Sequence, residues 1–213
     1  MGYYQAGFEV VGIDINPQKN YPFEFIQADI TKDKIFINDF DVIHASPPCQ
    51  AFTLANYKDR KDGKAKHYNL IPFMRNLLDL SGLPWVMENV PGAPLIDPIT
   101  LCGTQFNLGV FRHRKFESNI KLNAPEHKKH SGRIGDGKYF SVAGCAGRWK
   151  SWGKVQRNIT KGSAEEWRNA MDINWMTRKE LTQAIPPAYT KYIGEQLKRY
   201  IQNGTKKLPT ESD

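Results

Sequence analysis

Cysteine is scarce in this sequence, and its three copies are far apart: Cys49, Cys102 and Cys145. An odd number at such wide spacing predicts neither a disulfide framework nor a compact paired-cysteine zinc motif. We therefore expect reduced thiols, as in a protein that is not exported.

Long apolar runs and an export signal are also missing. No stretch approaches the roughly 20 apolar residues that a membrane-spanning helix needs, and residues 1–8 lack a basic region followed by an apolar one. Internal repeats and low-complexity tracts are absent as well. We expect a soluble, cytoplasmic, monomeric protein that does not bind membranes.

The composition is that of a folded, basic protein. Hydrophobic residues make up 40% and aromatic residues 12% of the 213 residues, which favours one globular domain with a small appendage. The formal net charge of +8 favours a polyanionic partner such as nucleic acid, because basic side chains near phosphates release condensed counterions.

Apolar runs in the first half each end in polar residues. The runs at 8–13, 23–27, 41–45 and 84–87 predict strands, and helical spacing at 68–80 predicts a strand–helix–strand crossover. This is the pattern of an α/β protein with an open parallel sheet, in which ligands bind beyond the carboxyl ends of the strands. The residues expected along that rim are Asp14, Asp29, Cys49 and Glu88.

The second half has a different character. Residues 118–162 show little periodicity and interleave glycine, basic and aromatic residues, which favours a loop-rich recognition lobe. Capping boxes starting at Ser163 and Thr177 predict two helices, and a last helix is expected from about Pro187 to Ile201. We expect a core over 1–117, the lobe over 118–162, returning helices over 163–202 and a frayed tail over 203–213.

Cys49 stands in SPPCQ, residues 46–50, at the end of a predicted strand. A thiol is a strong nucleophile, and the prolines before it would hold its backbone extended, so that the sulfur projects into the ligand crevice. A free cysteine is otherwise often a small buried apolar residue. The strand-end position and polar flank favour the nucleophile.

Four motifs occur together and in order. SPPCQ is followed by MENVP at 87–91, FRHRKF at 111–116 and QAIPP at 183–187. In motif identity and order the chain resembles the DNA cytosine-5 methyltransferase family. The resemblance implies a Rossmann-like fold that uses S-adenosylmethionine, double-stranded DNA as partner, base flipping, and a bacterial or phage-encoded role such as restriction–modification.

The resemblance also assigns catalytic roles. Cys49 would add to C6 of a flipped-out cytosine, and Glu88 would hold and protonate the ring at N3 and N4. Arg114 would contact the ring carbonyl and organise the cysteine, with Arg112 supporting the site. Protonation makes physical sense, because attack at C6 is slow unless the charge that builds up on the ring is neutralised.

Further residues are candidates for cofactor and substrate binding. An acidic residue at a strand end of such a sheet can accept the ribose hydroxyls, and Asp29 would receive the adenine amino group. The expected cofactor residues are Asp14, Ile15, Asp29, Ile30 and Pro48. The expected substrate residues are Ser46, Gln50, Asn89, Val90, Arg133, Arg148, Trp149 and Lys150.

The chain departs from the family pattern at its start. The family begins with a strand and a glycine-rich turn that lies against the methionine part of the cofactor, and this chain starts after both. That strand would be central, so its absence is expected to leave unpaired backbone groups on its two neighbours. Our hypothesis is an N-terminally incomplete member; alternatively, another segment fills the place.

Other interpretations stay open. The chain could bind DNA without catalysis, or methylate an RNA cytosine, which the basic charge permits equally. Residues 132–138 have some features of a phosphate loop but lack its strand and spacing, so a flexible turn is expected. His127, His130 and Cys145 match no compact zinc spacing, and no metal is predicted.

Overall fold

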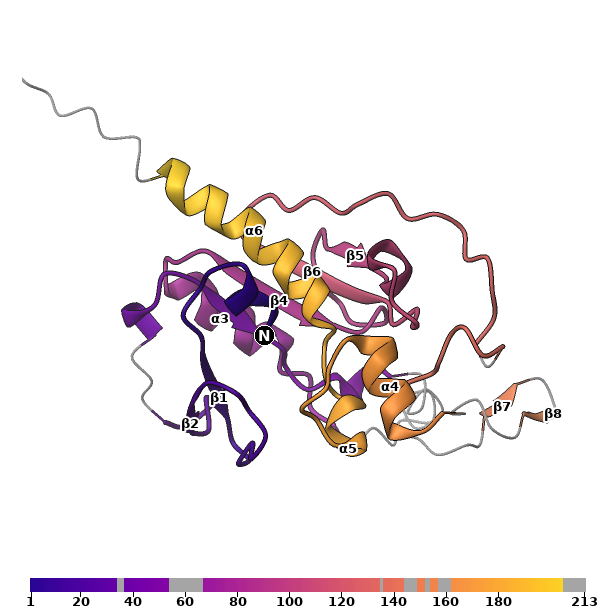
Figure 1. Ribbon diagram of the computed structural model, residues 1–213. Coiled ribbons are helices and arrows are strands. Elements are labelled where there is room, and N and C mark those ends of the chain that lie inside the picture. The colour runs from indigo at the N-terminus through magenta and orange to yellow at the C-terminus, as the bar shows by residue number, and fades with distance from the viewer. Residues whose placement is uncertain are drawn as a thin grey trace, which may run out of the picture. The chain divides into compact units, whose positions relative to one another are not determined.

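The computed structural model describes residues 1–33, 37–53, 67–134, 136–143, 149–151, 154–156 and 162–204 (Figure 1). The chain forms two compact units. The first comprises Met1–Ile35 and Pro186–Asp213, and the second comprises Phe36–Ile185. Within the described residues, no helix is long and apolar enough to cross a membrane.

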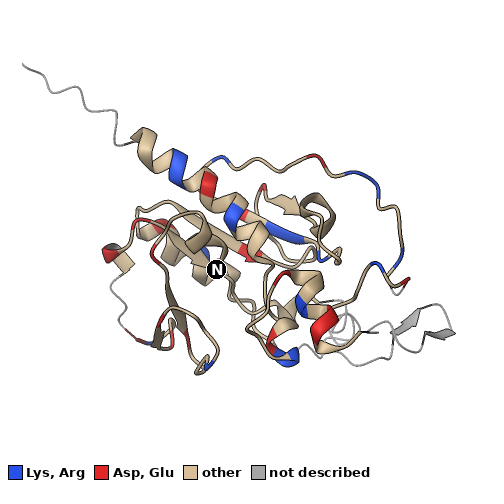
Figure 2. Cartoon of the chain, viewed as in Figure 1, with Lys and Arg blue, Asp and Glu red and all other residues tan. Residues whose placement is uncertain are grey.

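The first unit combines a small parallel sheet with two helices. Strands β1 (Val11–Asp14) and β2 (Glu24–Gln27) pair in parallel, with Asp14 opposite Gln27. Helix α1 (Gly2–Gln5) packs on α6 (Pro187–Gly204). Glycines make this approach possible, since a Cβ on Gly2 would clash with the Pro187 carbonyl oxygen, and one on Gly194 would lie 2.8 Å from the Ala6 Cβ. Figure 2 shows basic and acidic residues alternating along α6.

The second unit is built on a four-stranded sheet in the order β3-β4-β6-β5. Strand β3 (Ile43–Ala45) is parallel to β4 (Trp85–Asn89), and helix α3 (Ile71–Leu80) connects them along the chain. Strand β6 (Arg114–Ser118) runs antiparallel to both β4 and β5 (Ile99–Leu101). Strand β4 has a strand on each side, and all five of its residues are buried.

A buried ion pair joins α3 to β6. The Nε atom of Arg75 lies 2.6 Å from Oε1 of Glu117, and its NH2 atom donates to Oε2 at 2.8 Å. Glu117, which is 4% exposed, also accepts the Ile96 N–H at 2.8 Å. These partners compensate for burying the carboxylate, and they fix the helix against the sheet.

The remaining elements of the second unit are short. They are the 3₁₀ helices η1 (Ile37–Asp39), η2 (Cys49–Ala51) and η4 (Gly103–Phe106), strands β7 (Trp149–Ser151) and β8 (Lys154–Gln156), and helices α4 (Ala164–Met171) and α5 (Arg178–Leu181). An apolar cluster packs α4 and α5 against Val110 and Val142. Both predicted capping boxes are present, from Ser163 to Glu166 and from Thr177 to Glu180.

The predicted α/β, Rossmann-like fold class is confirmed, and so are the four strands and the crossover helix. Two details differ. The sheet of the second unit is mixed, because β6 runs antiparallel to its two neighbours, β4 and β5. The last helix, expected to end near Ile201, continues to Gly204, so residues 203 and 204, which were predicted to fray, are helical.

The edges of the two sheets bear on the predicted missing strand. Among the strands that the structure describes, β1 pairs only with β2, and β3 pairs only with β4. Each therefore has one side without a strand partner. The division into core, recognition lobe and returning helices stays a prediction.

Candidate active site

Strand register brings the SPPCQ and MENVP motifs together. Ala45 lies opposite Met87 in the parallel β3–β4 pair, so the next residues along, Ser46 just after β3 and Glu88 near the end of β4, are neighbours. The Ser46 side chain is hydrogen-bonded to Glu88. One position further, the Asn89 amide donates to the Pro47 carbonyl at 2.9 Å.

Glu88 is a buried carboxyl group with an arginine partner. It is 6% exposed, and its Oε1 atom lies 3.1 Å from Nε of Arg114. Burial raises the pKa of Glu88 above its ordinary value, while the charge of Arg114, the Ser46 hydrogen bond and the charge of Arg112 oppose the shift. A raised pKa makes this carboxyl easier to protonate, as a proton donor requires.

Arg112 has a different position from Arg114. Its guanidinium donates to four backbone carbonyls: Val142 at 2.6 Å, Ala184 at 2.9 Å, Thr182 at 2.9 Å and Leu181 at 3.4 Å. Its backbone is left-handed, with φ of 33°, which is strained for a non-glycine residue. We interpret Arg112 as a positioning residue that ties the RHR segment to the QAIPP motif.

Replacing Arg112 by methionine is expected to lower the free energy of unfolding by about 4 kcal/mol, because several carbonyls would lose a charged donor. Chemical denaturation of the full chain measures this loss. The exposed helical Arg199 offers a matched control, and Arg199→Met should change stability by under about 0.5 kcal/mol. A loss below about 1 kcal/mol for Arg112→Met would show that the four contacts do not stabilise the fold.

Cys49 begins the turn that follows the prolines. Its carbonyl accepts the N–H groups of Phe52 at 2.8 Å and Thr53 at 3.1 Å, which closes helix η2. The residue is half-buried and its thiol is free. A Cβ on Gly92, just after MENVP, would lie 2.8 Å from the Phe52 carbonyl oxygen. Only glycine allows that approach, which holds the MENVP turn against the cysteine turn.

His44 was not predicted as a site residue, but it contacts one. Its Nε2 atom lies 3.0 Å from Oγ of Ser46, the residue that bonds Glu88. Burial lowers the pKa of His44 to about 4. At neutral pH a neutral imidazole therefore contacts the serine. His44 lies within a strand, and nothing in the sequence pattern there indicated a site residue.

Protonation of His44 alone should lower the free energy of unfolding by about 3 kcal/mol as the pH drops from 6.5 to about 4. The folded-state pKa lies below the unfolded value of 6.5, so the unfolded chain takes up more protons in this window. The contribution is complete above pH 6.5 and is lost towards pH 4. Chemical denaturation at several pH values within this window measures the free energy of unfolding, which should change less with pH in His44→Asn than in the parent chain. An equal pH dependence in the two proteins would contradict the prediction.

The predicted cofactor residues of the first unit lie at the carboxyl ends of β1 and β2. Asp14 ends β1, and its Oδ1 atom accepts the Asn16 N–H at 2.7 Å. Ile15 follows and is 56% exposed. Asp29 accepts the Thr31 hydroxyl at 2.6 Å and pairs with Lys32 at 3.0 Å. These bonds lower the pKa of Asp29 to about 2.

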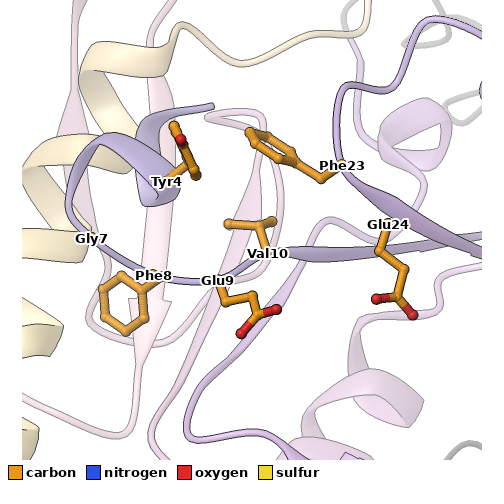
Figure 3. A pocket seen from close by; sticks show the side chains of 7 residues that line it. All are labelled: Tyr4, Gly7, Phe8, Glu9, Val10, Phe23 and Glu24. Carbon is orange, nitrogen blue, oxygen red and sulfur yellow. The ribbon is translucent and has the colours of Figure 1, made fainter.

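A hollow in the same unit lies away from these carboxylates. It is lined by Tyr4, Gly7, Phe8, Glu9, Val10, Phe23 and Glu24, and has a volume of about 590 Å³. Figure 3 shows Tyr4, Val10 and Phe23 as its apolar wall, with Glu24 on β2 and Glu9 on the segment just before β1. It includes none of the predicted cofactor residues, so its size does not identify the cofactor site.

The other predicted residues are placed in part. Ser46, Pro48 and Gln50 are exposed, Asn89 is buried, and Val90, half-buried, donates its N–H to Asn89 Oδ1 at 3.0 Å. Ile30 is half-buried.

Arg133 lies in a turn around Asp136, whose carboxylate accepts the N–H groups of residues 133 and 138, as expected for this segment. Arg148 lies outside the described residues, and for Trp149 and Lys150 only the backbone of β7 is described.

Comparisons with known proteins agree with this arrangement. Residues 14–95 match the family model of the C-5 cytosine-specific DNA methylases, which spans both SPPCQ and MENVP. No curated protein matches the sequence of the chain.

Solved structures show the same fold at low identity. One, described as a DNA modification methyltransferase encoded within a prophage (E. coli), is 14% identical with a TM-score of 0.58, over 94% of this chain and 95% of that chain. A mutant of Spodoptera frugiperda DNMT2 is also 14% identical, with a TM-score of 0.52, over 92% of this chain and 94% of that chain.

Proposed function

Residues 14–95 of this chain belong to the C-5 cytosine-specific DNA methylase family, and from that premise we propose that the chain methylates C5 of cytosine in double-stranded DNA. The observation that carries the proposal is the group around Glu88. A buried carboxyl with a raised pKa lies between Ser46 and Arg114, in the motif next to the cysteine turn. The net charge of +8 favours a polyanionic substrate.

Cys49 supplies the nucleophile of the reaction. Its thiolate forms a bond to C6 of the ring, and the electron pair of the C5–C6 double bond moves towards C5 and N3. Protonated Glu88 gives its proton to N3, so that no full negative charge builds up on the ring. The ring must leave the base stack first, because C6 is shielded within the duplex.

When bound, S-adenosylmethionine would supply an electrophilic methyl group to the activated C5, and the electron pair of its methyl–sulfur bond would stay on the leaving S-adenosylhomocysteine. The C5 proton then leaves to a base, the C6–sulfur bond breaks, and the electron pair returns Cys49 to the thiolate. Glu88 takes back the N3 proton in the same step, which leaves 5-methylcytosine and restores both side chains. Arg114 holds the Glu88 carboxyl at 3.1 Å and prevents it from turning away.

The residues at the ends of β1 and β2 fit an adenosyl group. Asp14 is a carboxylate at a strand end, suited to ribose hydroxyls, and the exposed Ile15 beside it offers an apolar surface for the adenine. Asp29, whose side chain is 18% exposed, is a carboxylate acceptor suited to the adenine amino group, beside the bonds that Thr31 and Lys32 already make to it. We assign these residues, with Ile30 and Pro48, to the cofactor.

Tritium release tests the proposal directly, because only reaction at C5 exchanges that hydrogen. The full chain is incubated with S-adenosylmethionine and mixed-sequence duplex DNA that carries tritium at C5 of cytosine. Release that requires S-adenosylmethionine supports the proposal. RNA labelled in the same way is tested in a separate reaction, and release from RNA but not from DNA would make RNA the substrate. If the chain binds DNA but releases no tritium, it is a DNA-binding protein without this activity, and the proposed function is wrong.

A further inference from the structure

Four metal-ligating side chains from three separate segments of the second unit meet at one point. Cys102 follows β5, His113 precedes β6, and two more come from the loop after β6. Their ligand atoms all lie within 4.8 Å of one another, and the four are Cys102, His113, His127 and His130. Cys102 is fully buried, while His127 is exposed, so the cluster extends from a buried thiol to the protein surface.

The short contacts within the cluster converge on His130. Its Nε2 atom lies 3.1 Å from Nε2 of His127 and 3.3 Å from Sγ of Cys102. A ring nitrogen has either one lone pair or one hydrogen, so it cannot satisfy both neighbours with good geometry. The three imidazole centroids are separated by 5.0 to 5.3 Å. A cation among these atoms would satisfy all of them at once.

The dimensions are close to those of a tetrahedral zinc site. Zinc bonds of about 2.0 to 2.3 Å place neighbouring ligand atoms roughly 3.3 to 3.8 Å apart. The Sγ–Nε2 contact of 3.3 Å falls at the short end of this range, and the Nε2–Nε2 contact of 3.1 Å lies just below it. The other separations, up to 4.8 Å, would close by at most about 1 Å on metal binding. One thiolate with three imidazoles suits zinc better than a hard cation such as magnesium.

Surrounding residues hold the ligands in place. The Phe111 ring stacks on His130 at 3.9 Å with an interplanar angle of 7°. The Cys102 N–H donates to Gln105 Oε1 at 2.6 Å, and the Gln105 amide donates to the Pro125 carbonyl at 2.6 Å. These bonds join the cysteine segment to the loop that carries His127 and His130. Such supporting contacts are typical of metal sites.

We propose that Cys102, His113, His127 and His130 bind one zinc ion. With four protein ligands the site is closed and structural, since no position is left for water. Burial lowers the pKa of His113 and His130, and neighbouring histidines add to the shift, which agrees with neutral imidazoles that can ligate. His113 stands between Arg112 and Arg114, so the ion would also fix the segment that delivers both arginines.

Metal analysis of the full chain tests the proposal, after purification with any histidine tag removed. About one zinc per chain is expected, and Co²⁺ loaded in its place should give a thiolate-to-metal absorption band. Cys102→Ser should lose the band, and His127→Ala, which changes an exposed side chain, should weaken zinc binding at least about tenfold.

Matched controls separate this site from other thiols and histidines. Cys49→Ser and His67→Ala, an exposed histidine elsewhere in the unit, should both keep one zinc and the Co²⁺ band. Circular dichroism establishes that each variant is folded. Zinc well below one per chain in the parent protein, or a Co²⁺ band that survives in Cys102→Ser, would overturn the proposal. Neither readout depends on methyl transfer, so an inactive chain can still confirm the site.

Discussion

Replacing Cys49 by alanine should abolish methyl transfer, with a loss of at least about a thousandfold. Without the thiolate, no bond forms at C6, and C5 is never activated to attack the methyl group. DNA binding should remain, because the exposed residues on both sides of Cys49, Pro48 and Gln50, are unchanged. The half-buried position of Cys49 leaves room for the smaller side chain without a large loss of stability.

Covalent trapping measures the same step without turnover. Duplexes containing 5-fluorocytosine cannot lose a proton from C5, so the adduct persists and can be resolved on a denaturing gel. The parent chain should form it only with S-adenosylmethionine, and Cys49→Ala should form none. Cys145→Ala is the control for a cysteine outside the SPPCQ motif and should still be trapped. An adduct in Cys49→Ala would assign the nucleophile to another residue.

Changing Glu88 to glutamine should lower the rate of methyl transfer by about a hundredfold to ten-thousandfold. Glutamine keeps the size of the side chain and can bond Ser46, but it cannot transfer a proton to N3. The loss should appear in kcat measured with saturating DNA, while DNA affinity changes little. Glu195→Gln, on the exposed face of α6, is the matched control and should keep full activity.

The pH profile distinguishes a proton donor from a structural carboxyl. Burial raises the pKa of Glu88, so the protonated form survives to higher pH than for an ordinary glutamate, and the rate should fall as the pH rises through that raised pKa. This descending limb should be missing in Glu88→Gln. An unchanged profile, or a loss below about tenfold, would mean that Glu88 only supports the fold of the site.

Sequence patterns predicted the parts of the site that follow strands. Cys49 and Glu88 lie beyond β3 and within the end of β4, because apolar runs predict buried strands and their polar ends share one sheet edge. The capping boxes at Ser163 and Thr177 were equally local signals. Such features depend on neighbours only a few residues away.

Contacts between distant segments could not be predicted in this way. His127 and His130 were considered as ligands with Cys145, but their partners are Cys102 and His113, which only the β5–β6 pairing brings near. The Cys145 position lies outside the described residues. The contacts of Arg112 reach about 70 residues along the chain, and the antiparallel direction of β6 has no sequence signature.

The four carbonyl bonds of Arg112 also determine how this part of the molecule opens. Residues 181–184 lose three of these bonds whenever α5 unfolds locally, and only the bond to the Val142 carbonyl then holds the strained left-handed backbone at Arg112. Arg114 and its pairing with Glu88 follow two residues later. Amide hydrogens of residues 111–114 and 181–184 should therefore exchange with solvent as one cooperative unit, at a free energy set by the small helix rather than by the sheet.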